Sequence, residues 1–183
     1  MKSIVFLIGA DEAPKSNAKQ LATEIGFSEI KNYSNMVEIE QQSISYPVSF
    51  FLFEQISNVN IYKEVIESIR SCKRLKLRFS PLILLSDSPT PEFIRQSITI
   101  GFDDIISQPY QGSCIKKRLA KQIDHSITYY ETPKFFGPDR RRNSDNSLTT
   151  NINRRGIEKC RQFKFVRNLT NGISITKETI DAG

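Results

Sequence analysis

The sequence predicts an α/β fold, a doubly wound sheet of five parallel strands, followed by a mostly irregular basic C-terminal tail. Three observations support this prediction. Short apolar runs recur along the first two thirds of the chain, segments of helical length and period separate them, and the composition becomes polar and basic after Tyr130. Strands that alternate with helices must pair in parallel, because only a crossover returns the chain to the same edge of a sheet.

The five strands are predicted from the apolar runs, at residues 4–8, 27–33, 48–53, 81–85 and 105–106. The first run is apolar at every position, which is typical of strands covered on both faces. The second run is the weakest of the five. Polar residues that follow the runs are expected at one edge of the sheet, where doubly wound folds bind their ligands.

Helices are predicted between the strands from the spacing of apolar residues. Residues 58–72 and 112–129 each repeat an apolar residue at every fourth position: Ile61, Val65 and Ile69 in the first, and Ile115, Leu119, Ile123 and Ile127 in the second. Another helix begins after Thr90, has Pro91 in its first turn and ends at Gly101. The predicted order is βα repeated five times.

The chain is predicted to consist of a folded domain over residues 1–130, a linker over 131–160 and a tail over 161–183. The net charge is +6, and the linker and tail together hold 11 basic and 6 acidic residues, so +5 of that charge follows the domain. Prolines, glycines and an arginine run interrupt regular structure in the linker. In the tail, Asn171-Gly172 is a turn signal that predicts a short hairpin.

Cysteine spacing and the length of the apolar runs indicate the cellular compartment that we expect for the protein. Cys72, Cys114 and Cys160 are separated by 42 and 46 residues, which fits neither a disulfide framework nor paired metal ligands. The longest apolar runs have five or six residues, whereas a transmembrane helix needs about 20. We therefore expect a protein of the reducing cytoplasm that makes no contact with a membrane.

Two segments resemble the fourth and fifth strands of response-regulator receiver domains. Residues 80–86 form an apolar strand that ends in Ser86. Residues 101–110 contain a helix-ending Gly, an Asp-Asp pair, an apolar pair and a Gln-Pro dipeptide before Tyr110, where receivers have Lys-Pro before an aromatic residue. The resemblance covers residues 1–128 and implies a flavodoxin-like receiver fold and a role in two-component signal transduction, the bacterial phosphorelay.

The resemblance also implies a pocket. In receivers an Asp after the third strand accepts a phosphoryl group, two earlier acids hold Mg²⁺, and a hydroxyl and a Lys bind the phosphoryl oxygens. Here the acceptor slot holds Glu54, the acidic pair is replaced by Asp11 and Glu12 one or two positions late, and the hydroxyl and Lys slots hold Ser86 and Gln108. We therefore expect a degenerate phosphoacceptor pocket with no catalytic residues, no metal and no cofactor. Mg²⁺ would bind only if the acidic pocket were functional.

Two interpretations of this pocket stay open. Ser86 and Gln108 could hold the carboxylate of Glu54 in one fixed arrangement that imitates an acyl phosphate. Alternatively, the pocket has decayed and Glu54 faces water. In both cases the resemblance implies a non-enzymatic, response-regulator-like protein that acts by phosphorylation-independent protein–protein interaction.

A partner-binding face is implied by the surface that receivers use for pairing, formed by their fourth helix, fifth strand and fifth helix. The residues it would expose here are Phe93, Arg95, Tyr110, Lys116, Lys117 and Lys121. The implied partner is a histidine kinase or another signalling protein, or a second copy that forms a homodimer through this face. A lysine-rich face is also usual on a solvated helix.

The extension after Tyr130 is similar to a Phe-Gly-Pro-Asp-Arg-Arg-Arg segment that follows receiver-like domains in alphaproteobacteria. Its candidate contacts are Phe135, Phe136, Arg140, Arg141 and Arg142. Aromatic rings next to Pro and Gly can fold back onto the domain as a strap, while the arginines can reach an acidic partner. The alternative is a solvated basic linker.

Two other functions are alternatives. One is an active phosphoacceptor that uses Glu54 with Asp11 and Glu12. The other is nucleic-acid binding through the basic tail, where Phe163 and Phe165 would stack on bases, although no nucleic-acid-binding motif is present. A nucleotide-binding enzyme is not expected, because the turn after the first strand lacks both repeated glycines and a phosphate-loop lysine.

Overall fold

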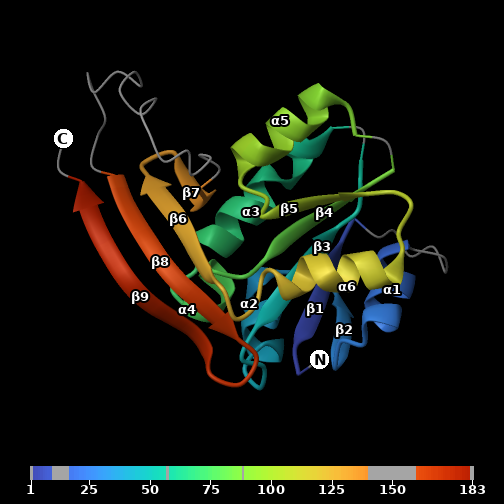
Figure 1. Cartoon of the computed structure of the whole chain (residues 1–183), viewed down its shortest axis with the longest axis horizontal. Helices are drawn as coiled ribbons and strands as arrows, with labels where there is room; N and C mark the ends of the chain where they lie inside the picture. The colour runs from blue at the N-terminus through green and yellow to red at the C-terminus, as the bar shows by residue number, and fades with distance from the viewer. Residues whose placement is uncertain (1, 10–16, 57, 88, 140–159, 182–183) are drawn as a thin grey trace.

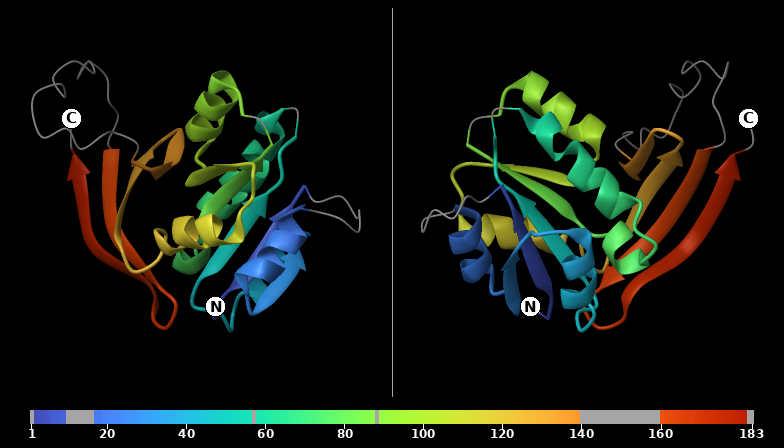
Figure 2. Two further views of the ribbon diagram at one scale, coloured as in Figure 1. Left: turned by 45° about the vertical axis from the view of Figure 1, so that its right-hand side comes forward. Right: turned by 180° about the vertical axis from the view of Figure 1, so that it is seen from behind.

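The structure is a computed structural model that describes residues 2–9, 17–56, 58–87, 89–139 and 160–181. It contains two β-sheets, one of five strands and one of four (Figure 1). Helices cover the five-stranded sheet on both faces, and the four-stranded sheet lies beside it (Figure 2).

The five-stranded sheet is parallel throughout, which confirms the predicted fold class. Its order, β2-β1-β3-β4-β5, is the flavodoxin-like doubly wound order. Strands β1, β3 and β4 are buried at every residue, which is why they read as unbroken apolar runs. The strands are β1 (Ile4–Ile8), β2 (Glu29–Asn32), β3 (Ser49–Phe53), β4 (Leu82–Ser86) and β5 (Asp104–Ser107).

Two hydrophobic cores lie on opposite faces of this sheet, because successive strand residues point to opposite sides. Val5 and Leu7 face the core beneath two helices, whereas Ile4, Phe6 and Ile8 face the other core. The first pair of helices is α1 (Asn17–Ile25) and α6 (Gly112–Ala120); the other face carries α2 (Met36–Gln42), η1 (Val59–Tyr62), α3 (Lys63–Arg70), α4 (Leu75–Arg78) and α5 (Pro91–Ile100).

Helix α5 follows the signals in its sequence. The Thr90 Oγ1 atom accepts a hydrogen bond from the Phe93 amide at 3.2 Å, and Pro91 occupies the first turn. Gly101 ends the helix with a φ of +105°, a left-handed conformation that favours glycine.

The predicted helix over 58–72 exists, and Ile69 is buried as predicted, but the beginning of its buried face differs from the prediction. Ile61 is 65% exposed, whereas Val59, Tyr62 and Ile66 are buried. The segment begins as the 3-10 helix η1 and continues as α3, so the change of period rotates the early residues relative to a continuous α-helix.

The C-terminal part of the chain is more regular than the sequence indicates. Helix α6 ends at Ala120, and Ile127, expected on that helix, lies in a strand. The segment expected to be mostly irregular forms a second, antiparallel sheet of order β7-β6-β8-β9, apart from residues 140–159, 182 and 183, which lie outside the described residues. Its strands are β6 (Ser126–Thr132), β7 (Phe135–Pro138), β8 (Cys160–Asn168) and β9 (Gly172–Asp181).

The hairpin predicted around Asn171-Gly172 is confirmed and is longer than expected. Strands β8 and β9 pair from Asn168 opposite Gly172 to Cys160 opposite Asp181. The domain boundary expected at residue 130 falls within β6, and β6 pairs with both β7 and β8. The second sheet therefore begins within the segment that was expected to end the first domain.

An aromatic core lies between the two sheets. Phe79, between α4 and β4, contacts Phe165, Phe136 and Phe163 with ring-centroid distances of 4.6, 5.2 and 5.6 Å. Tyr129 of β6 completes the cluster, at 4.8 Å from Phe165. These rings belong to both parts of the chain, so burying them joins the parts into one unit.

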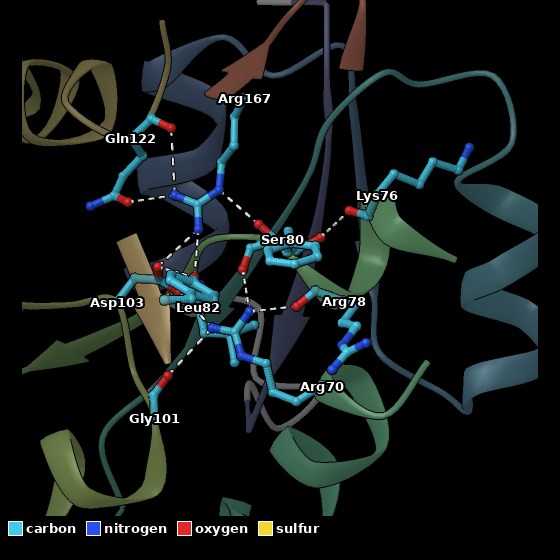
Figure 3. Close-up of polar contacts among 11 residues, drawn as sticks. Arg70, Lys76, Arg78, Ser80, Leu82, Gly101, Asp103, Gln122 and Arg167 are labelled. Carbon is cyan, nitrogen blue, oxygen red and sulfur yellow. Dashed lines mark hydrogen bonds and ion pairs between the residues drawn. The ribbon is translucent and has the colours of Figure 1, made fainter. Parts of the chain in front are cut away.

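A buried charge network continues this junction (Figure 3). The Asp103 carboxylate accepts hydrogen bonds from Arg70 at 2.7 Å, from Arg167 at 2.9 Å, and from the Tyr129 hydroxyl. It also accepts the Leu82 amide at 2.8 Å. Burial opposes ionisation of Asp103, but the charges of Arg167 and Arg70 outweigh it and hold its pKa below the ordinary value.

Both guanidinium groups also donate to backbone carbonyls or to a side-chain amide, although the buried Arg70 Nε atom has no hydrogen-bond partner among the described residues. Arg167, which is completely buried, donates to Phe79 O and to Gln122 Oε1, both at 2.7 Å. Arg70 donates to Ser80 O at 2.8 Å. Asp103 immediately precedes β5, so the network lies at the amino ends of the parallel strands, opposite the edge where a ligand site is expected.

Candidate functional site

The expected pocket lies where β3, β4 and β5 end. Glu54 directly follows β3, Ser86 is the last residue of β4, and Gln108 directly follows β5. The Glu54 amide donates to Ile8 O of β1 at 3.0 Å, so this residue continues the sheet. Asp11 and Glu12, the expected metal ligands after β1, lie outside the described residues.

The carboxylate of Glu54 contacts the N-terminus of helix α1. Its Oε1 atom accepts a hydrogen bond from the Ala18 amide at 2.9 Å. Amides in the first turn of a helix have no partner within the helix, and the helix dipole favours a negative charge there. The Glu54 carbonyl accepts a second hydrogen bond, from the Tyr62 hydroxyl at 2.6 Å. Glu54 is therefore anchored through both its side chain and its backbone.

Ser86 is fully buried and pairs with a residue that the sequence analysis did not single out. Its hydroxyl donates to Gln55 Oε1 at 2.5 Å, and the same oxygen accepts the Asp87 amide at 2.7 Å. Gln55 is the second residue after β3, so its position at a strand end is the only signal that could have indicated this role.

Gln108 and Tyr110 both converge on Asp87. The Gln108 Nε2 atom donates to Asp87 Oδ1 at 2.7 Å, and the Tyr110 hydroxyl donates to the same oxygen at 3.1 Å. Burial, and then the charge of Asp87, raises the pKa of Tyr110, so its hydroxyl stays protonated and can donate this bond.

The pocket differs from the fixed arrangement that the sequence suggested. In that arrangement Ser86 and Gln108 hold the Glu54 carboxylate, but Ser86 donates to Gln55 and Gln108 donates to Asp87. In the decayed-pocket alternative Glu54 faces water; its side chain is half-buried, and one carboxylate oxygen accepts the Ala18 amide. The strand ends thus contain a Glu54–α1 contact and a separate group formed by Gln55, Ser86, Asp87, Gln108 and Tyr110.

The described residues offer no complete magnesium site. No group of three His, Cys, Asp or Glu side chains with metal-binding geometry occurs among them. Of the three acids expected to act together, only Glu54 is described, and one of its oxygens is occupied by a helix amide. Gln108, which the resemblance places in the lysine slot, has a neutral amide side chain.

The expected partner-binding face is formed by α5, β5 and α6. Phe93 is half-buried against the core and Tyr110 is hydrogen-bonded to Asp87, so neither ring is freely presented. Arg95 is exposed and forms an ion pair with Glu92 at 2.7 Å. The exposed cations on α6 and just after it are Lys116, Lys117 and Lys121.

The aromatic part of the extension packs on the domain, as the strap interpretation predicts. The Phe136 ring contacts Phe79, and the Arg78 guanidinium lies 4.3 Å from the centre of the Phe136 ring. Arg78 also forms an ion pair with Glu131. Phe135 lies beside Gly101, at the end of α5. Arg140, Arg141 and Arg142 lie outside the described residues.

The two aromatic rings that the nucleic-acid hypothesis requires for base stacking are buried. Phe163 is 5% exposed and Phe165 is completely buried, so neither ring can stack on a base. Arg167 is also buried and paired with Asp103. Among the tail cations that the structure describes, Arg161, Lys164 and Lys177 are exposed.

None of the described helices is long and apolar enough to cross a membrane.

Comparison with known proteins gives structural matches only. No family model and no curated protein matches the chain. The receiver domain of a sensor histidine kinase from Pseudomonas aeruginosa, solved with magnesium in its active-site cleft, superposes with a TM-score of 0.49 at 12% identity, over 66% of this chain and 97% of that one. A chemotaxis protein from Vibrio cholerae gives 0.47 at 15% identity, over 66% and 98%. At these values the matches assign no family, and the fold assignment rests on the strand order.

Proposed function

We propose that this chain is a response-regulator-like module of two-component signalling that acts by binding a protein partner, without a phosphorylation cycle. The observation that carries the proposal is the hydrogen bond from the Ala18 amide to Glu54 Oε1. The Glu54 carboxylate already accepts a hydrogen bond from the first turn of a helix, and a phosphoryl group added to this carboxylate would have to displace that bond.

The chemistry of the neighbouring slots supports the same proposal. Phosphoryl transfer to a carboxylate needs cations that neutralise the phosphoryl oxygens and a hydroxyl that binds them. The residue in the lysine slot is the neutral Gln108, and its amide is directed to Asp87. The Ser86 hydroxyl is directed to Gln55. The proposal therefore assigns Glu54 a positioning role and includes no catalytic residue, metal or cofactor.

A protein partner is proposed in place of a substrate. The exposed lysines of α6 give this side of the domain a positive surface, which suits a partner with acidic residues such as a histidine kinase or another signalling protein. Pairing of two copies through α5, β5 and α6 is the variant of this proposal in which the partner is a second chain.

Intact-mass measurement after incubation with acetyl phosphate and Mg²⁺ tests the proposal. We expect no gain of a phosphoryl group under conditions that fully modify a receiver with an intact acidic pocket. A labile gain of one phosphoryl group that disappears in Glu54→Gln would overturn the proposal and assign the active-phosphoacceptor alternative.

A further inference from the structure

Among the described residues, one edge of the second sheet has no strand partner. In the part of the chain that the structure describes, β9 pairs only with β8, at nine of its ten residues. Figure 1 shows β9 at the side of the sheet that faces away from α5 and α6. A free strand edge presents amides and carbonyls that another strand can pair with, and the adjacent side chains determine which strand fits.

Two lysines face each other across β8 and β9. Lys164 is directly opposite Lys177, and both side chains are exposed. Thr128 of β6 lies opposite Lys164 in the same row, and the next row pairs Gln162 with Thr179, so the neighbouring residues are neutral. Like charges directly opposite each other destabilise a strand pair. Within the described residues neither lysine has an ion-pair partner, so a carboxylate brought to this edge would be attracted by both.

Apolar side chains lie on the other face of the same strand. Ile175 and Ile180 are 37% and 55% exposed, and Ile175 lies opposite Phe165 of the aromatic core. Ile180 lies on the face opposite Lys177 by ordinary alternation. Ile175 does so because of a β-bulge, in which the register shifts between Lys164 and Phe165 and leaves Thr176 as an extra residue. The edge of β9 therefore has Lys177, beside Lys164 of β8, on one face and two isoleucines on the other. Its acidic residues are Glu178, on the isoleucine face, and Asp181, at the end of the lysine face.

A second copy of the chain fits this edge poorly. Two strands related by a two-fold axis perpendicular to the sheet pair residues of the same face. Lys177 and Glu178 point to opposite faces, so self-pairing cannot place one opposite the other. Registers centred near the middle of β9 instead place Lys177 opposite Lys177, or Glu178 opposite Glu178, and both are repulsive. A register centred on Thr179 places Lys177 opposite Asp181, but it pairs only the last five residues of the strand.

We propose that β9 is a docking edge for an extended acidic segment of another protein, which adds to the second sheet as a fifth strand. A carboxylate of that segment lies opposite Lys177 and within reach of Lys164, and an apolar side chain lies opposite Ile180. Main-chain pairing supplies affinity in this mode, and alternate side chains supply specificity. The proposal is independent of the pocket, since it holds whether or not Glu54 is phosphorylated.

A synthetic peptide, Thr-Val-Thr-Thr-Glu-Val-Thr, tests the docking edge in antiparallel register, with its Glu opposite Lys177 and its first Val opposite Ile180. Binding to the full chain is measured by fluorescence anisotropy, and hydrogen exchange identifies the protected amides. We expect protection of β9 amides, and affinity roughly three- to tenfold weaker for the peptide with Lys in place of Glu.

Charge reversal in the protein completes the test. Lys177→Glu should reverse the preference between the two peptides, whereas Lys73→Glu, which makes the same change in an exposed loop, should leave it unchanged. Equal affinity for the two peptides, or an absence of protection in β9, would overturn the proposal. Concentration-dependent dimers with β9 protected would also overturn it and assign the edge to a second copy.

Discussion

Asp103 accepts hydrogen bonds from two guanidinium groups that belong to different parts of the chain. Arg70 comes from α3 of the five-stranded domain, and Arg167 comes from β8 of the second sheet. All three side chains are almost completely inaccessible to water. A buried charge that loses its partner has no water to solvate it, so each member of this group depends on the others.

We predict that Arg167→Met lowers the free energy of unfolding by about 3–5 kcal/mol, because it leaves Asp103 and the Phe79 carbonyl without this donor. Urea denaturation measures the change. Arg161→Met in the same strand is the matched control and should change stability by less than about 0.5 kcal/mol, since Arg161 is exposed. Equal effects of the two substitutions would show that the buried network contributes little.

The lowered pKa of Asp103 predicts an acid-dependent loss of stability. The folded pKa lies below the ordinary value of 3.8, so the ionised form stabilises the fold above that value, and this contribution is lost as the pH falls through the folded pKa. The difference in unfolding free energy between the wild type and Asp103→Asn should be constant above about pH 5 and shrink below pH 4. A difference that stays constant to the lowest pH would contradict the assignment.

At the scale of elements, helix α1 is tied to the end of β3 by Glu54. The carboxylate accepts the Ala18 amide, and this contact connects the end of β3 to the position of a helix. Under the proposed function no phosphoryl group is added at Glu54, so signalling does not disturb this contact. The contact therefore suits a module with one conformation at this edge of the sheet.

We predict that Glu54→Ala loosens the first turn of α1 and lowers the free energy of unfolding by about 0.5–2 kcal/mol, the usual effect of removing a helix cap. The Ala18 amide should exchange with solvent faster in this variant. Glu24→Ala, in the exposed part of the same helix, is the control and should leave the exchange of Ala18 unchanged. Unaltered exchange in Glu54→Ala would contradict the capping role.

The elements that the sequence predicts well are those with one dominant pattern. Strands β1, β3 and β4 are apolar at nearly every residue, and α5 has both its cap and its glycine end. The sequence does not predict strand β6, because Ile127 continues the four-residue spacing of apolar residues in α6. The alternation of side chains through Tyr129 becomes evident only once their partners in β8 are known. The buried Arg167 reads as a solvated cation in the sequence.

For the whole molecule, the two sheets form one folded unit. The aromatic rings around Phe79 and the charges around Asp103 come from both the five-stranded domain and the second sheet. Neither the aromatic core nor the charge network is therefore complete without both parts of the chain. The sequence predicts the strand-end positions of Glu54, Ser86 and Gln108 correctly, because parallel strands end at the same edge. It does not predict their hydrogen-bond partners, since Ala18, Gln55 and Asp87 meet them only through the tertiary fold.

We predict that a chain shortened to residues 1–139 does not fold cooperatively, because it lacks Phe163, Phe165 and Arg167 and leaves Arg70 and Asp103 exposed to solvent at the junction. Urea denaturation followed by circular dichroism measures the loss. A single sharp transition with the same midpoint as the full chain would show that the five-stranded domain is independent of the second sheet.

The most direct test of the central claim, that the acceptor slot is already occupied by a structural contact, is titration of the full chain with beryllofluoride and Mg²⁺ followed by amide NMR. Beryllofluoride imitates a phosphoryl group on a carboxylate, so it binds only where the acceptor and metal ligands are available. The account predicts that the amide signals of Glu54, Ser86 and Gln108 do not shift. Saturable shifts of these signals would contradict it.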